Sequence, residues 1–339
     1  MLKTTLKYTV LAAAAMSLPG LAAAEPVKLR VTNGLSPTHV VSTEGIEPWM
    51  ACVTDRTGGE VTFDYFPGGQ ISKVTETTDA IANGLADIGF MSPSNEGSKL
   101  PLNGLAMLPG IGTSAVEITE AYRASIDAGS PLADELVALG LRPFILNALA
   151  PYQIMARNKK TDSLDSFRGV KTRVAGGAMN FTALALGAVP TEMPAGDLYI
   201  ALERGTVDAT ILAKSSVKTY SLQELVTSMS SNASLGTSTQ FFAISEASWG
   251  KLSAPHQEAV MSCGAEVEKS LAEYLDKQET ELQAEFSGLG IDVYDFPPEE
   301  LEKINAALEA ATLDYVKRLG ARGLPAQEGY DSLRNRSKN

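Results

Sequence analysis

Residues 27–33 read Val27-Lys28-Leu29-Arg30-Val31-Thr32-Asn33, and their alternation of apolar and polar side chains is typical of a β-strand with one buried face. The strand ends in the turn Gly34-Leu35-Ser36-Pro37, and apolar residues then recur with helical spacing from Ser42 to Arg56. Strand spacing returns at Val61-Thr62-Phe63-Asp64-Tyr65-Phe66. One strand, one helix and one strand make a β-α-β unit, so the sequence predicts an α/β fold.

The same alternation continues on both sides of residue 150. A short buried strand is expected at 86–91, and a second cycle of strands and helices begins at 169–174. A crossing near residue 150 therefore divides the chain into two similar α/β lobes. The helical spacing that starts at Pro255 extends to about Phe286, which is longer than a usual globular helix. We expect this helix to span the two lobes.

The first 24 residues have the pattern of a secretory signal peptide. Lys3 and Lys7 precede the apolar run 8–16, and Ala22-Ala23-Ala24 supplies small residues for cleavage just before Glu25. The alternative is a membrane anchor, but the run is shorter than the roughly 20 residues that cross a bilayer. We therefore expect a protein exported to the periplasm and cleaved near Ala24.

Composition limits the possible partners. The formal net charge of -12 argues against binding to nucleic acid or to an anionic membrane surface. Because the chain has only two histidines and two cysteines, we do not expect a metal site. We expect no cofactor either. Cys52 and Cys263 could pair in an oxidising compartment, or they could remain two separate buried thiols. The sequence leaves these two possibilities open.

Three blocks in the second half carry a resemblance to a known family. They are Phe167-Arg168-Gly169-Val170-Lys171-Thr172-Arg173-Val174, Leu186-Gly187-Ala188-Val189-Pro190-Thr191-Glu192-Met193 and Leu202-Glu203-Arg204-Gly205-Thr206-Val207-Asp208-Ala209. In this order and at these separations, the chain resembles the solute-binding proteins of tripartite ATP-independent periplasmic (TRAP) transporters. The front half agrees at Phe66-Pro67-Gly68-Gly69-Gln70-Ile71 and Asn83-Gly84-Leu85-Ala86-Asp87-Ile88-Gly89.

The resemblance implies a two-lobed periplasmic binding protein fold, similar to type II, that closes over its ligand by hinge motion. It also implies delivery of the ligand to the membrane permease subunits of a transporter that an ion gradient drives. We expect a monomer. The expected divisions are a signal peptide at 1–24, lobe one at 25–149 and 240–278, lobe two at 150–239 and 279–330, and a flexible tail at 331–339.

Arg173 occupies the position at which this family binds the ligand carboxylate. Its planar guanidinium matches the two carboxylate oxygens, although an arginine here could also form an ordinary salt bridge. Members that bind sialic acid have a second arginine earlier in the chain, and counting back from Arg173 places Gln153 at that position. Those members also have an asparagine in the pocket where this chain has Ala213. The resemblance therefore favours a smaller or more apolar acid. Lys214 is a possible second cation; the alternative is a solvated lysine.

Lobe one contributes further expected contacts, because loops at the ends of strands face the cleft in this fold class. Asn33 and His39 flank the turn after the first strand, and Asn95 follows the strand at 86–91. Asn33 could equally be a plain turn residue. Alternate faces of the strand at 240–245 make one of Phe241 and Phe242 a cleft wall, and we take Phe241.

The expected function is capture of a small organic anion for a TRAP-type secondary transporter. A receptor that presents its ligand to a sensor kinase would use the same fold. An enzyme is disfavoured, because the sequence contains no nucleophile elbow, no phosphate loop and no paired metal-ligand motif. The ligand stays open among a C4-dicarboxylate, a 2-oxo acid, an aromatic acid, an amino-acid-like zwitterion and a sulfonate.

Overall fold

The computed structural model describes residues 26–127 and 129–334. The expected signal peptide and its cleavage site lie outside these residues. No helix within the two described ranges combines the length and the apolar character needed to cross a bilayer.

The first of two β-sheets is built mainly from the N-terminal half. Its strand order is β2-β1-β3-β10-β4. The strands are β1 (Val27–Thr32), β2 (Val61–Phe66), β3 (Ile88–Met91), β4 (Leu141–Ala148) and β10 (Thr239–Ser245). Strand β1 pairs in parallel with β2 and β3, as the β-α-β pattern predicts, whereas β10 is antiparallel to both β3 and β4. The chain therefore returns to the first sheet after it has built most of the second.

The second sheet has the order β11-β9-β5-β8-β6-β7. Its strands are β5 (Gln153–Ala156), β6 (Lys171–Val174), β7 (Val189–Glu192), β8 (Ala209–Leu212), β9 (Ser228–Ser230) and β11 (Asp292–Tyr294). Strand β6 is parallel to its neighbours β7 and β8, and β5 is antiparallel to β8 and β9. The parallel strands β6, β7 and β8 end at one edge, where the loops that follow them meet the first lobe.

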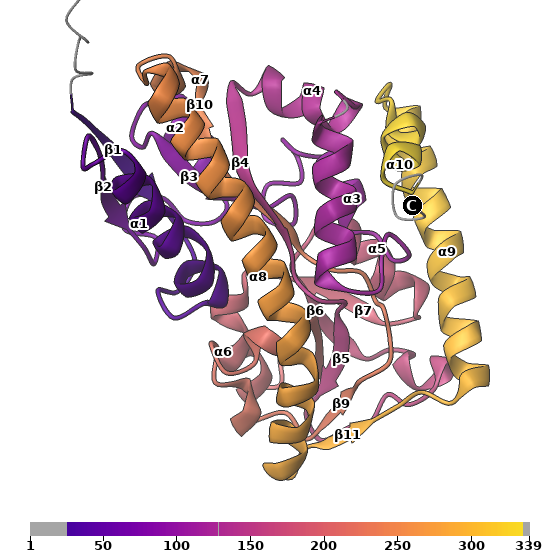
Figure 1. The fold of residues 1–339 in the computed structure, drawn as a ribbon. Helices are drawn as coiled ribbons and strands as arrows, with labels where there is room; N and C mark the ends of the chain where they lie inside the picture. The colour runs from indigo at the N-terminus through magenta and orange to yellow at the C-terminus, as the bar shows by residue number, and fades with distance from the viewer. Residues whose placement is uncertain (1–25, 128, 335–339) are drawn as a thin grey trace, which may run out of the picture.

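Helices cover both sheets. The helices of the described chain are α1 (Glu47–Arg56), α2 (Thr77–Ala82), α3 (Ala115–Asp127), α4 (Pro131–Ala138), α5 (Ala178–Ala185), α6 (Leu198–Glu203), α7 (Glu246–Trp249), α8 (Ala254–Gly288), α9 (Pro298–Ala321) and α10 (Ala326–Arg334). Helix α8 has 35 residues and packs against β4, α1 and α3 of the first lobe and against β11 of the second. Figure 1 shows it running diagonally along both lobes, as the sequence predicted.

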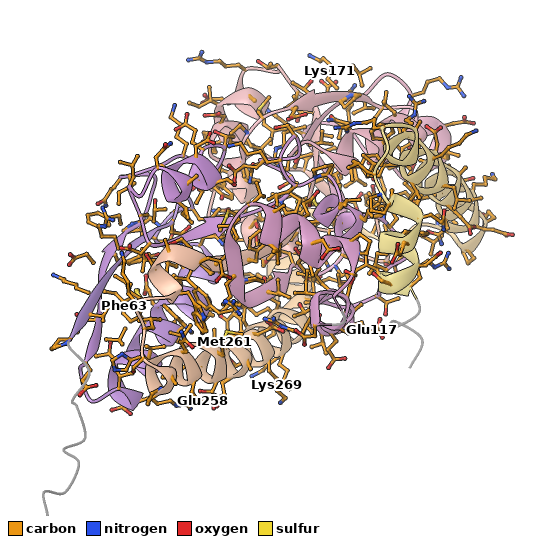
Figure 2. All side chains as sticks on the ribbon, turned by 90° about the horizontal axis from the view of Figure 1, so that it is seen from above. Phe63, Glu117, Lys171, Glu258, Met261 and Lys269 are labelled. Atoms are coloured by element: carbon orange, nitrogen blue, oxygen red, sulfur yellow. A yellow bond between two sulfur atoms is a disulfide. The ribbon has the colours of Figure 1, made fainter. Side chains whose placement is uncertain are left out.

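The polar side of α8 faces outward. Figure 2 shows Glu258 and Lys269 on the outer surface of this helix, while Cys263, Val267 and Leu271 are buried on its inner side. Cys263 forms a disulfide with Cys52 of α1, with 5.9 Å between the two Cα atoms. Of the two alternatives that the sequence left open, the disulfide is confirmed.

The two sheets support the expected two-lobed fold. The chain crosses from β4 to β5 near residue 150 and from β9 back to β10 before Thr239, so we propose lobe boundaries at these two crossings, as expected from the sequence, whereas the expected placement of 326–330 in lobe two does not fit the packing of α10. The expected loose tail is wrong for residues 331–334, which belong to α10. Ala326, Tyr330 and Leu333 are spaced to bury one face of α10 against α3 and α4 of the first lobe.

Candidate functional site

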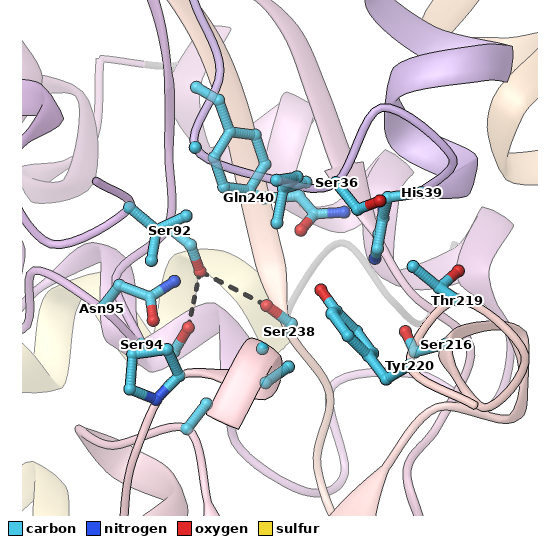
Figure 3. A pocket seen from close by; sticks show the side chains of 18 of the residues that line it. Ser36, His39, Ser92, Ser94, Asn95, Ser216, Thr219, Tyr220, Ser238 and Gln240 are labelled. Atoms are coloured by element: carbon cyan, nitrogen blue, oxygen red, sulfur yellow. Dashed lines mark hydrogen bonds between the residues drawn. The ribbon is translucent and has the colours of Figure 1, made fainter. Parts of the chain in front are cut away.

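A cavity of about 800 Å³ lies between the two lobes. On one side it is lined by the loops that follow β1 and β3, and on the other by the ends of β6 and β8 and by the segment 216–220. Figure 3 shows polar side chains from both lobes facing into this space. Loops beyond the ends of strands are where α/β sheets bind ligands, so this cavity is the candidate site.

Arg173 on β6 is the buried cation of the cavity. Its side chain is only 2% exposed, and its Nε donates to the carbonyl oxygen of Met193 at 2.9 Å. No carboxylate in the described part of the chain lies within ion-pair distance of its guanidinium, and no described acceptor bonds its two terminal nitrogens. Burial lowers the pKa of Arg173, but a guanidinium remains protonated at physiological pH. The cavity therefore presents a buried positive charge without a direct ion-pair partner, and the exposed carboxylate of Asp197 acts on it only from beyond ion-pair distance.

His39, in the loop after β1, is the neutral donor of the cavity. Its Nδ1 accepts a hydrogen bond from the backbone N–H of Val41 at 3.2 Å, so the ring proton lies on Nε2. Burial lowers the pKa of His39 to about 4, and the ring is uncharged at neutral pH. No described residue accepts a hydrogen bond from Nε2, which leaves this N–H available to a ligand.

Two tyrosines of lobe two, the buried Tyr152 and the half-buried Tyr220, lie close to Arg173. Burial raises the pKa of Tyr152 to about 12, against the opposing effect of the positive charge of Arg173. Burial also raises the pKa of Tyr220, whose ring centroid lies 6.2 Å from that of His39. Both tyrosines are therefore protonated at neutral pH, and each offers a hydroxyl group beside the arginine.

Gln240 of β10 lines the floor of the cavity. It stands directly opposite Asn147 in the β10–β4 pairing, and its Nε2 donates to Asn147 Oδ1 at 3.0 Å. The Nδ2 of Asn147 is buried and has no partner among the described residues. This pair of carboxamides thus has hydrogen-bonding capacity that the fold does not use.

A cluster of serines in the cavity lining is, by contrast, internally bonded. Ser92 Oγ lies 2.8 Å from Ser94 Oγ and 3.3 Å from Ser238 Oγ, and it donates to the carbonyl oxygen of Thr239 at 2.9 Å. Figure 3 shows the two bonds from Ser92 to Ser94 and Ser238, with Asn95 beside them. The hydroxyl groups of this cluster mostly satisfy one another.

Residues 33–318 match the protein family described as "Bacterial extracellular solute-binding protein, family 7". The chain belongs to this family. It is 24% identical over 271 residues to the sialic acid-binding periplasmic protein SiaP of Vibrio cholerae, a match that covers 78% of this chain and 81% of that protein.

Solved structures of TRAP solute-binding proteins share the fold of this family 7 protein. One from a marine metagenome, specific for aromatic acid ligands and in complex with 3-hydroxybenzoate, superposes with a TM-score of 0.86 at 20% identity, over 93% of this chain and 99% of that one. Another, from Bordetella bronchiseptica with bound (R)- and (S)-mandelate, has a TM-score of 0.82 at 23% identity, over 92% and 99% of the two chains. The two-lobed fold predicted from the sequence is confirmed.

In this family 7 protein, the cavity brings together three of the eight side chains expected from the sequence: Arg173, His39 and Asn95. Their contact with a ligand stays a prediction. The other five do not line the cavity: Asn33, Gln153, Ala213, Lys214 and Phe241. Asn33 is a turn residue, because its Oδ1 accepts from the backbone N–H of Leu35 and its Nδ2 donates to Ser42 and Tyr65.

Gln153 and Lys214 are both buried, and they border a separate hollow that Asp276 and Glu279 of α8 also line. Gln153 Nε2 donates to the carbonyl oxygen of Ala233, and its Oε1 accepts from Ser230. Lys214 is 3% exposed and forms an ion pair of 3.0 Å with Glu279 of α8. It is therefore neither the second cation of the cleft nor a solvated lysine. Because Glu279 already neutralises Lys214, Arg173 is the one buried cation among the described residues that has no ion-pair partner.

Sequence reasoning missed several residues that line the cavity, namely Tyr152, Leu212, Tyr220 and Gln240. Three of them are immediate neighbours of residues that were chosen: Tyr152 precedes Gln153, Leu212 precedes Ala213, and Gln240 precedes Phe241. Adjacent residues of a strand point to opposite faces, so an error of one residue moves the choice to the wrong side. Tyr220 lies in an irregular segment, where no such alternation could have identified it.

Proposed function

We propose that this family 7 solute-binding protein captures a small organic acid as its carboxylate and delivers it unchanged to the membrane permease of a TRAP transporter. One observation carries the proposal: Arg173 is buried, charged and without a carboxylate partner. Burying an unpaired charge costs several kcal/mol, and a ligand carboxylate would offset that cost through two parallel hydrogen bonds. The arrangement is therefore ready for an anion that the chain does not itself supply.

The ligands named for similar proteins support this chemistry. The similar solved structures hold 3-hydroxybenzoate or mandelate, and SiaP is named for sialic acid. These compounds differ in shape, but each carries one carboxylate group. A buried arginine is the side chain that best matches such a shared group.

The remaining parts of the proposal are that the ligand is released chemically unchanged and that the protein acts in the periplasm. His39 has its Nδ1 occupied by a backbone N–H and a pKa of about 4, so it acts as a hydrogen-bond donor rather than as a general base. This supports a receptor that releases its ligand chemically unchanged. We further propose that the mature protein acts as a periplasmic monomer after cleavage near Ala24.

The test combines a ligand search with an arginine series. Thermal-shift screening of the purified protein against organic acids identifies a ligand, and calorimetry then compares Arg173→Ala and Arg173→Lys with the unmodified protein. We expect Arg173→Ala to lose at least about 30-fold in affinity, since removing one partner of a buried charge pair costs about 2–5 kcal/mol. Arg173→Lys should lose about 10-fold or more, because an ammonium group cannot make the paired contact.

Arg168→Ala is the matched control. Arg168 lies five positions before Arg173 along the chain, but its side chain is 82% exposed and pairs with Asp165. Its replacement should leave affinity unchanged. The ligand-free Arg173→Ala protein should be no less stable than the unmodified protein, since the substitution removes a buried unpaired charge. Unchanged ligand affinity in Arg173→Ala contradicts the proposed function.

A further inference from the structure

We infer that the cavity contains a second, uncharged recognition subsite, formed by His39 and Gln240, that binds a hydroxyl or carbonyl oxygen of the ligand away from its carboxylate. The inference rests on the proposed function, because it takes Arg173 as the carboxylate site. It narrows the ligand to a monocarboxylate that carries at least one neutral oxygen substituent.

The first support is the unused hydrogen-bonding capacity of these two residues. The Nε2–H of His39 has no acceptor within the described chain, and the ring is held in this tautomer by the backbone of Val41. Gln240 bonds only one carboxamide atom of Asn147, and Asn147 Nδ2 is left buried without a partner. Buried polar groups without partners are uncommon in native proteins, so each one requires an explanation.

The Gln240–Asn147 pair can meet either kind of ligand atom. With Gln240 Nε2 donating to Asn147 Oδ1, as in the structure, Gln240 Oε1 is free to accept a hydrogen bond. If both carboxamides rotate, Asn147 Nδ2 donates to Gln240 Oε1, and Gln240 Nε2 becomes the free donor. A ligand hydroxyl, which both donates and accepts, can bond the free atom of Gln240 in either arrangement together with the His39 N–H.

The charge distribution excludes a second carboxylate at this subsite. Arg173 is the unpaired buried cation of the described cavity lining, while Lys73 and Asp197 lie at exposed positions on its rim. A carboxylate placed against neutral His39 and two carboxamides would lose its hydration without gaining a cation. An ammonium group could donate to Gln240 Oε1, but it would face the N–H of His39 and would find no buried carboxylate in the described lining, so it would lose hydration there too. Dicarboxylates and zwitterions are therefore disfavoured.

The position of Tyr220 suggests how one ligand could reach both Arg173 and the subsite formed by His39 and Gln240. Its ring lies 6.2 Å from the ring of His39, and its hydroxyl is close enough to Arg173 for the positive charge of the arginine to act on the pKa of Tyr220. Figure 3 shows Tyr220, His39 and Gln240 facing one another across the cavity. A flat ligand body lying along Tyr220 would extend from Arg173 in lobe two to His39 in lobe one. Hydroxylated aromatic or cyclic monocarboxylates fit this arrangement.

The experiment uses matched probes in calorimetry at pH 7: benzoate, its 2-, 3- and 4-hydroxy derivatives, and isophthalate, which has a second carboxylate in place of the hydroxyl group. At least one hydroxybenzoate should bind about 10-fold more tightly than benzoate, as expected for one added hydrogen bond to buried partners. Isophthalate should bind less tightly than that hydroxybenzoate. In His39→Phe and in Gln240→Met, the affinity ratio of the hydroxybenzoate to benzoate should fall to about one.

A conservative variant separates recognition from packing. His39→Gln keeps an N–H donor and should retain part of the ratio that His39→Phe loses, which keeps the test valid if one variant folds poorly. Equal binding of benzoate and all three hydroxybenzoates by the unmodified protein overturns the subsite while leaving the role of Arg173 intact. Failure of every carboxylate to bind overturns the proposed function and the subsite with it.

Discussion

Arg173 and His39 are buried in the same cavity in opposite charge states, and their intrinsic chemistry explains why. Desolvation disfavours the charged form of each side chain. A guanidinium starts with a pKa so high that burial cannot discharge it at neutral pH, whereas an imidazole starts near 6.5 and does lose its proton. The cavity is thus cationic at one end and neutral at the other.

The neutral state of His39 makes the stability of the protein depend on pH. Its pKa is 6.5 in the unfolded chain and about 4 in the folded protein, so only the unfolded chain takes up this proton between those values. The contribution of neutral His39 to the free energy of unfolding is fully present above pH 6.5 and is lost as the pH falls. The loss amounts to about 3 kcal/mol at pH 4. Urea unfolding at pH 7 and pH 4.5 should show a smaller loss for His39→Phe than for the unmodified protein. Equal losses would contradict the burial of a neutral imidazole.

At the residue scale, the sequence could predict which segments reach the cavity. It could identify only some of the side chains that line it. Arg173 was found because a family motif fixes its position. Gln153 was chosen where Tyr152 faces the cavity, and Phe241 where Gln240 does, because short strands buried on both faces lack the alternation that would set their register. The sequence also could not show that Lys214 meets Glu279, which is 65 positions away.

At the element scale, α8 depends on close approach to the first sheet. A Cβ atom added at Gly264 would lie 2.1 Å from the backbone oxygen of Phe144 in β4, so the helix would have to move away. Gly264→Ala should therefore reduce the free energy of unfolding by about 2–3 kcal/mol. Gly288, in the same helix, has no atom within 4 Å of its added Cβ, and Gly288→Ala should be neutral or slightly stabilising. Similar midpoints of urea unfolding for the two variants would contradict this packing.

The disulfide fixes the same helix to α1. Cys52 and Cys263 are 211 positions apart, and a bridge over a loop of that length stabilises the fold by about 5 kcal/mol in the chain-entropy model. Cys52→Ala with Cys263→Ala should lower the midpoint of urea unfolding accordingly. Protein purified from the periplasm, denatured without reduction, should contain no thiol that an alkylating reagent modifies. Two alkylated cysteines in mass spectra would reject the bridge.

The elements that the sequence did not predict share one property: each is short or polar. Strands β9 and β11 have three residues apiece, which is too few for periodicity to be recognised. Helix α10 is polar overall, and its apolar face becomes apparent only where it packs on the first lobe. Longer elements such as β1, α1 and α8 were predicted because several periods of their pattern are present.

At the scale of the whole molecule, α8 is attached to both lobes within about one helical turn. Asp276 accepts hydrogen bonds from the backbone N–H groups of Ala115 and Val116, at the start of α3 in lobe one. Glu279 pairs with Lys214 of lobe two. The helix therefore passes from one lobe to the other between these two carboxylates, so any relative motion of the lobes must be absorbed near this point and at the two strand crossovers.

Ligand binding should reduce the separation of the lobes, because the groups that would hold the ligand are divided between them. Arg173 and Tyr220 belong to the second lobe and His39 to the first, so a bound carboxylate adds contacts that form only when the lobes approach. Small-angle scattering with saturating ligand should show a smaller radius of gyration than the ligand-free protein. Arg173→Ala at the same ligand concentration should show no change, since it would bind too weakly to be occupied. Identical curves for the unmodified protein with and without a ligand that calorimetry shows to be bound would mean that the lobes are already fixed at their final separation.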